Sequence, residues 1–114
     1  MAQYTKVVLT GSTDGRPVKV AATATLGTTI HTADSSAIDE ITLWAVNSDT
    51  TDRKLTIEFG GAAAPGDIIE VTIPAEDGLY MVCPGLILTG SLVVTAFCET
   101  TNVVSIVGYV QRIT

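Results

Sequence analysis

The sequence contains few groups that can carry out acid–base chemistry. Charged residues make up 16% of its 114 positions, and His31 is the only histidine. Soluble domains typically carry roughly 25% charged residues. His31 has no nucleophile and orienting acid arranged around it in a local motif, and the GxSxG pattern is missing. The sequence therefore predicts no enzyme and no catalytic residue, with a structural or surface role for His31.

Patterns that bind metals or phosphates are also missing. Asp49, Asp52 and Asp67 lie in polar loops without the spacing of a calcium-binding EF-hand, and Glu76-Asp77 is a pair of turn acids. The segment 11–15, GSTDG, is small and polar but lacks the GK[ST] ending of a P-loop, so it is predicted to be a hairpin loop. We expect no metal and no cofactor.

Basic residues are half as numerous as acidic residues, six against twelve, and the net charge is −6. Nucleic-acid binding needs a basic patch that replaces phosphate counterions, and the six basic residues are scattered along the chain. No apolar run approaches the roughly 20 residues that cross a bilayer, and the N-terminal MAQYTK has no apolar signal core. We expect no direct nucleic-acid partner, no membrane and synthesis in the cytoplasm.

Two cysteines, Cys83 and Cys98, occur in strand-like segments. They do not have the CxxC spacing of a metal or redox site. Two interpretations stay open. Both residues can be buried as small hydrophobic side chains, or they can form a disulfide between adjacent strands.

Beta-branched residues are abundant, with 18 Thr, 13 Val and 10 Ile. Branching at the β-carbon disfavours helices and favours strands. Residues 54–59 alternate with period two, which places Leu55, Ile57 and Phe59 on one face and Lys54, Thr56 and Glu58 on the other. Residues 69–73 alternate in the same way. This pattern is typical of a strand with one face in a core and one face in solvent.

The pattern predicts an all-β fold of about eight antiparallel strands in a β-sandwich or jelly roll, because such folds limit exposed edges. Segments 33–40 and 60–64 are too short to be useful helices. We expect residues 1–5 to form an N-terminal arm and residues 6–114 to form one domain. The expected strands are 6–10, 17–25, 28–32, 38–47, 54–59, 69–73, 86–98 and 103–113.

Segments 92–98 and 103–110 are apolar on both faces, and the mean hydropathy of +0.43 is high for a soluble monomer. A strand that is apolar on both faces needs cover on both faces, and in a two-layer sandwich the second cover comes from another chain. We therefore expect a homo-oligomer. The arm either adds as a strand to a neighbour's sheet or stays disordered. The predicted interface residues are Tyr4, Trp44, Val94, Phe97, Ile106 and Tyr109.

An ordered series of short segments resembles small virion proteins of tailed bacteriophages, of the head-decoration or fibre type. The series comprises ITLWAVN at 41–47, FGG at 59–61, VTIPA at 71–75, PGLILTGSL at 84–92 and GYV at 108–110. The resemblance covers roughly residues 28–114 and includes no catalytic motif. It implies a jelly-roll module that forms trimers.

The resemblance implies a capsid decoration, or cement, protein on the virion surface, whose partners are its own copies and the major capsid protein. By binding only the expanded capsid lattice, such a protein would stabilise that lattice by mass action. The alternative is a tail, neck or fibre component with glycan-binding loops.

Overall fold

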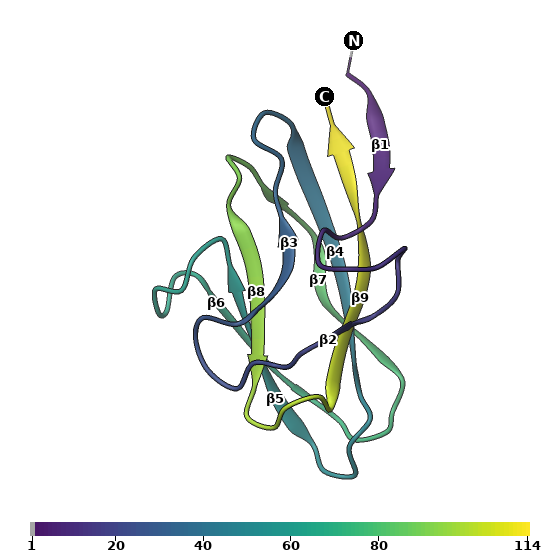
Figure 1. Cartoon of the computed structure of the whole chain (residues 1–114), viewed down its shortest axis with the longest axis vertical. Coiled ribbons are helices and arrows are strands. Elements are labelled where there is room, and N and C mark those ends of the chain that lie inside the picture. The colour runs from purple at the N-terminus through teal and green to yellow at the C-terminus, as the bar shows by residue number, and fades with distance from the viewer. Residues whose placement is uncertain (1) are drawn as a thin grey trace.

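The computed structural model describes residues 2–114, and these residues form nine strands and no helix (Figure 1). Every ladder between strands is antiparallel. The strands build two sheets that pack face to face. The prediction of an all-β sandwich is therefore confirmed, and the abundance of Thr, Val and Ile explains why no segment prefers a helix.

The larger sheet has five strands, in the order β1-β9-β4-β7, with β2 also paired to β9. The smaller sheet has four strands, in the order β3-β8-β5-β6. The strands of the five-stranded sheet are β1 (Tyr4–Val7), β2 (Val18–Lys19), β4 (Ile38–Asn47), β7 (Leu79–Leu88) and β9 (Val104–Ile113). Those of the four-stranded sheet are β3 (Thr28–Thr32), β5 (Arg53–Phe59), β6 (Ile68–Ile73) and β8 (Val93–Cys98).

The topology is that of a jelly roll. Early strands pair with late ones, so that β1 and β2 pair with β9, β3 with β8, β4 with β7 and β5 with β6. The chain is therefore one long hairpin whose turn lies at residues 60–67. This hairpin folds over, and the ladders β4–β9 and β5–β8 join its successive pairs into two sheets.

The core lies between the sheets and is built from alternate residues of each long strand. Ile41 and Leu43 of β4 and Ile57 of β5 are fully buried there, as is Ile106 of β9. Each such side chain contributes roughly 1.5–3 kcal/mol when it leaves water. The period-two pattern thus places the inner face correctly.

The late apolar region differs from the prediction in its strand boundaries. Residues 86–98 form two strands, because Gly90 and Ser91 adopt positive φ and reverse the chain between β7 and β8. Strand β7 in turn continues through Pro84 and Gly85. Proline lacks an N–H donor, but β7 is an edge strand and has a register shift at this point, so no ladder partner loses a bond.

The N-terminal segment pairs with its own chain. Tyr4 and Thr5 lie opposite Ile113 and Arg112 in the β1–β9 ladder, so the first strand begins at Tyr4 instead of residue 6. Gln3 and Thr114 exchange two backbone hydrogen bonds of 2.9 Å. Figure 1 shows both ends of the chain at the same end of the molecule. Met1, the first residue of the expected arm, lies outside the described residues.

Both cysteines are buried and free. Cys83 donates its S–H to the backbone oxygen of Ile41 at 3.2 Å, and burial raises the pKa of its thiol. The interpretation as two buried hydrophobic residues is therefore the correct one of the two.

The central β4–β9 ladder depends on a glycine at position 108. A Cβ at Gly108 would lie 2.0 Å from the backbone oxygen of Thr42, so we expect Gly108→Ala to lower the free energy of unfolding by about 1–3 kcal/mol. Urea denaturation measures this loss. Gly66→Ala is the control, because nothing lies within 4 Å of its added Cβ. Equal stability of the two variants would contradict the close approach of β4 and β9.

Candidate functional site

A buried carboxylate, Asp39, connects the two sheets. It lies on β4, whereas its partner His31 lies on β3 of the other sheet, and both side chains are 0% exposed. The ring nitrogen Nε2 of His31 lies 2.8 Å from Oδ2 of Asp39. The backbone N–H of Thr10 donates to Nδ1 of His31 at 3.1 Å. Because Nδ1 accepts a bond, Nε2 carries the proton and donates it to Asp39.

Arg112 completes the network around Asp39. Its Nε and Nη2 atoms donate to the two carboxylate oxygens of Asp39 at 2.8 and 3.0 Å. The backbone N–H of Asp34 donates to the same carboxylate at 3.1 Å. Burial alone would raise the pKa of Asp39, but the hydrogen bonds from Arg112 and His31 outweigh that cost and lower the pKa to about 2.

The protein itself occupies the hydrogen-bonding groups of His31 in this network. Both ring nitrogens of His31 are occupied by the protein itself, and the ring has no exposed surface. A general base needs a free nitrogen within reach of a substrate proton. The sequence correctly placed His31 in a strand but did not identify its partners. Asp39 shares the inward parity of Ile41 and Leu43, and this signal could have found it.

A second buried carboxylate, Glu58, holds the loop between β2 and β3 against the four-stranded sheet. Glu58 is 1% exposed and accepts bonds from the hydroxyls of Thr25 and Thr95 and from the N–H of Gly27. Burial would raise the pKa of Glu58, but these bonds lower it below its usual range. The expectation that Thr56 and Glu58 face solvent is therefore wrong, because both side chains are buried and residues of the β2–β3 loop bond to Glu58.

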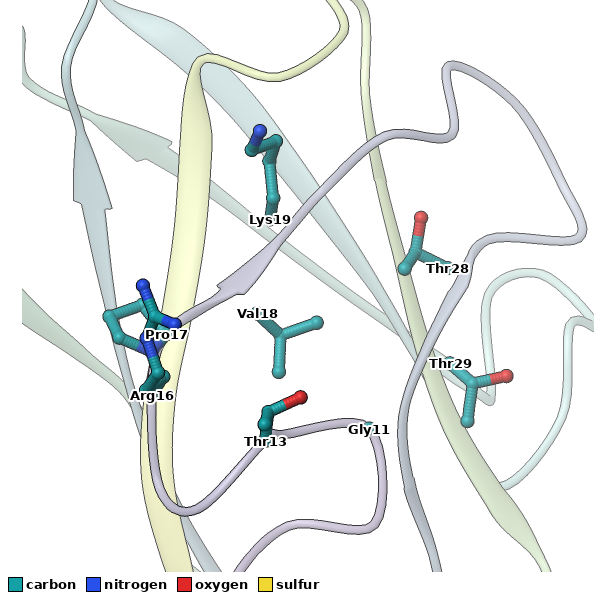
Figure 2. Close-up of a pocket in the computed structure, with 8 residues that line it drawn as sticks. All are labelled: Gly11, Thr13, Arg16, Pro17, Val18, Lys19, Thr28 and Thr29. Carbon is teal, nitrogen blue, oxygen red and sulfur yellow. The ribbon is translucent and has the colours of Figure 1, made fainter.

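A cleft of about 430 Å³ opens beside β2, between the loop that precedes it and β3 (Figure 2). Figure 2 shows Arg16 and Lys19 on the β2 side, Thr28 and Thr29 on the opposite side, and Val18 between them. Gly11, Thr13 and Pro17 complete its lining. The predicted hairpin loop 11–15 forms one wall of this cleft.

The outer face of the five-stranded sheet carries several exposed apolar side chains, among them Tyr4, Leu79 and Met81. The alternation of side chains along each strand, together with the strand register, identifies the residues that point away from the core residues Ile41, Leu43 and Ile106. We call the surface that they form the outer apolar face. Met81 is 53% exposed and Ile87 is 60% exposed. The outer apolar face comprises Tyr4, Ile38, Trp44, Val46, Leu79, Met81, Ile87, Val107, Tyr109 and Ile113.

Aromatic side chains lie near the middle of this face. The rings of Trp44 and Tyr109 are 6.1 Å apart, and the ammonium group of Lys6 lies 5.0 Å from the centre of the Tyr109 ring. The outer face of the four-stranded sheet is more polar, since Lys54 and Glu70 form a 2.8 Å ion pair across its β5 and β6 strands. The two outer faces of the sandwich thus differ in chemistry.

The structure brings half of the predicted interface residues together. Tyr4, Trp44 and Tyr109 lie on the outer apolar face, whereas Phe97 is half-buried on the other sheet. Val94 and Ile106 are fully buried between the sheets, and this placement removes both from the predicted interface. A strand that is apolar on both faces gave no sign of which face the core would use.

The loop acids are engaged within the protein. Asp49 pairs with Arg53 at 2.6 Å, Asp52 accepts the N–H of Ala75, and Asp67 accepts the N–H of Ala63. Within residues 2–114, no group of three or more His, Cys, Asp or Glu side chains could hold a metal ion. The same residues include no helix that is long and apolar enough to cross a membrane.

Comparisons with protein-family models, with curated proteins and with solved structures find no match to this chain. Its function is therefore inferred from its own residues and geometry.

The Asp39 network predicts a specific loss of stability in acid. A carboxylate whose pKa is about 2 in the folded protein and about 3.9 in the unfolded chain stabilises the fold above pH 4 by about 2 kcal/mol. This contribution is lost as pH falls through the folded pKa. We expect Asp39→Asn to be less stable than the wild type at neutral pH, with a difference that shrinks between about pH 4 and pH 2.

Urea denaturation at several pH values measures this difference. The control is Asp14→Asn, which also removes one negative charge, but from an exposed side chain. If the difference in free energy of unfolding between the wild type and Asp39→Asn stays constant down to pH 2, the low pKa of Asp39 is contradicted.

Proposed function

We propose that the protein is a structural subunit of a tailed-bacteriophage particle that associates through its outer apolar face. In its specific form, the proposal is a capsid decoration protein that binds the lattice of the major capsid protein as a homotrimer. The resemblance of the segments within residues 28–114 to small virion proteins supports the choice of particle. The outer apolar face supports the mode of action.

The outer apolar face is the observation that carries this proposal. An antiparallel sheet that packs on a core with one face normally presents polar side chains on the other. Here Leu79, Met81 and Ile87 of the edge strand β7 extend an apolar surface that continues across β4 and β9. Contiguous apolar surfaces of this kind mark sites of association, because their removal from water stabilises the complex.

The few polar groups on this face give an association its orientation. Lys6 and Glu40 project from the same face, on β1 and β4, with Gln111 of β9 between them in the register. Charges that border an apolar contact select its partner and geometry more than they increase its affinity. A subunit built in this way acts by binding and needs no reaction centre.

The alternative of glycan-binding loops finds less support. Sugar rings commonly stack on an aromatic side chain, and none of the residues that line the cleft beside β2 is aromatic. Trp44 and Tyr109 lie instead on the flat outer apolar face.

Charge introduced into the outer apolar face should prevent association. We expect the wild type to form an oligomer at micromolar concentration and Met81→Lys/Ile87→Lys to raise the dissociation constant at least tenfold, which corresponds to about 1.4 kcal/mol. Light scattering coupled to size-exclusion chromatography measures the mass. Binding to purified phage heads, compared with free capsid subunits, then tests the decoration role.

Leu26→Lys is the matched control, because Leu26 is an exposed apolar residue in the β2–β3 loop, outside this face. It should keep the wild-type mass. A monomeric wild type that also fails to bind heads would overturn the proposal. An oligomer that Leu26→Lys disrupts and the double variant does not would move the contact to another surface.

A further inference from the structure

The charges of the chain are divided unevenly along its length. Lys6, Arg16 and Lys19 precede residue 31, together with a single acid, Asp14. All the remaining acids follow residue 31. The three later basic residues all have acidic partners, since Arg53 pairs with Asp49, Lys54 with Glu70 and Arg112 with Asp39.

Arg16 and Lys19 differ from these paired residues. Among residues 2–114, no carboxylate lies within ion-pair distance of either side chain. Both line the cleft beside β2, and no acidic residue contributes to its lining. In a protein of net charge −6, the cleft is therefore a local concentration of positive charge.

The hydroxyl of Thr28 adds a donor to the cleft. Its Oγ1 atom accepts the backbone N–H groups of Ala21 and Ala22, at 3.2 and 3.0 Å. A hydroxyl oxygen has two lone pairs and one proton, so Thr28 can only donate to any further partner. Within the described residues its proton has no recorded acceptor. Arg16, Lys19 and Thr28 thus line the cleft from separate positions around it, and no carboxylate contributes to the lining (Figure 2).

The wall of the cleft is held in place by its own hydrogen bonds. Ser12 donates its hydroxyl to the backbone oxygen of Arg16 at 2.7 Å, and the N–H of Arg16 donates to the oxygen of Thr13 at 3.0 Å. Gly11 bonds to Ile30 of β3, and a Cβ at Gly11 would lie 2.3 Å from the oxygen of Thr29. The loop that carries Arg16 is therefore fixed before any ligand arrives, which lowers the entropic cost of binding.

We propose that this cleft is a binding site for a multivalent oxyanion, a ligand that bears phosphate or clustered carboxylate groups. Arg16 can form two parallel hydrogen bonds to such a group, Lys19 supplies a point charge and Thr28 donates its hydroxyl proton. The volume of about 430 Å³ falls within the range of small-molecule sites. This site is independent of the outer apolar face and of any association through it.

Titration of the full chain with inorganic pyrophosphate and with citrate tests the proposal by nuclear magnetic resonance. We expect saturable shifts of the amide signals of Gly11, Thr13 and Val18, with chloride at equal ionic strength as the blank. Arg16→Gln and Lys19→Gln should each weaken binding about tenfold, and the double variant should abolish it.

Lys54→Gln is the matched control, because it removes an exposed basic side chain from the outer face of the four-stranded sheet, outside the cleft lining. It should bind like the wild type. The proposal is overturned if neither anion shifts these signals, or if Lys54→Gln weakens binding as much as Arg16→Gln does, because general charge attraction then explains the result. Circular dichroism checks that each variant is folded.

Discussion

The buried carboxylate of Asp39 is the interaction on which the assembled sandwich depends. An ionised carboxylate in a protein interior is costly unless hydrogen-bond donors surround it. Asp39 obtains these donors from three places in the chain, namely His31 on the opposite sheet, Arg112 near the C-terminus and the backbone of Asp34. The charge is therefore satisfied only when the two sheets have packed and the last strand has found its register, which couples these steps of folding.

Glu58 is a second buried carboxylate whose donors come from distant segments of the chain, and it lies on the outer side of the four-stranded sheet. Its side chain accepts three bonds from the β2–β3 loop and from β8, and so covers part of the four-stranded sheet with the chain's own backbone. On the five-stranded sheet, the described residues leave Met81 and Tyr109 of the outer apolar face exposed. The chain thus covers part of one outer face of the sandwich itself, whereas the other outer face is the surface through which we propose association.

The sequence predicted the strands best where alternation and turn residues agree. Segments 28–32 and 38–47 match β3 and β4 in full, because β-branched residues alternate between polar boundaries. Prediction failed for Glu58, because alternation reports which face a residue occupies but not whether a distant loop covers that face. It also failed for Val94 and Ile106, since an apolar residue in a strand that is apolar on both faces fits the core and an interface equally well.

The cleft beside β2 could not be predicted at all, and the reason is topological. Arg16 and Lys19 are separated from Thr28 and Thr29 by a loop that crosses the edge of the sandwich, and only the folded hairpin brings the two segments together. Isolated basic residues in a sequence are usually solvated or paired, so their spacing carries little information. The pairing of every later basic residue with an acid can be seen only when the sheet registers are known. Lys6 also lacks an acidic partner, so the property that sets Arg16 and Lys19 apart is their shared position in the lining of one cleft, and that position depends on the whole fold.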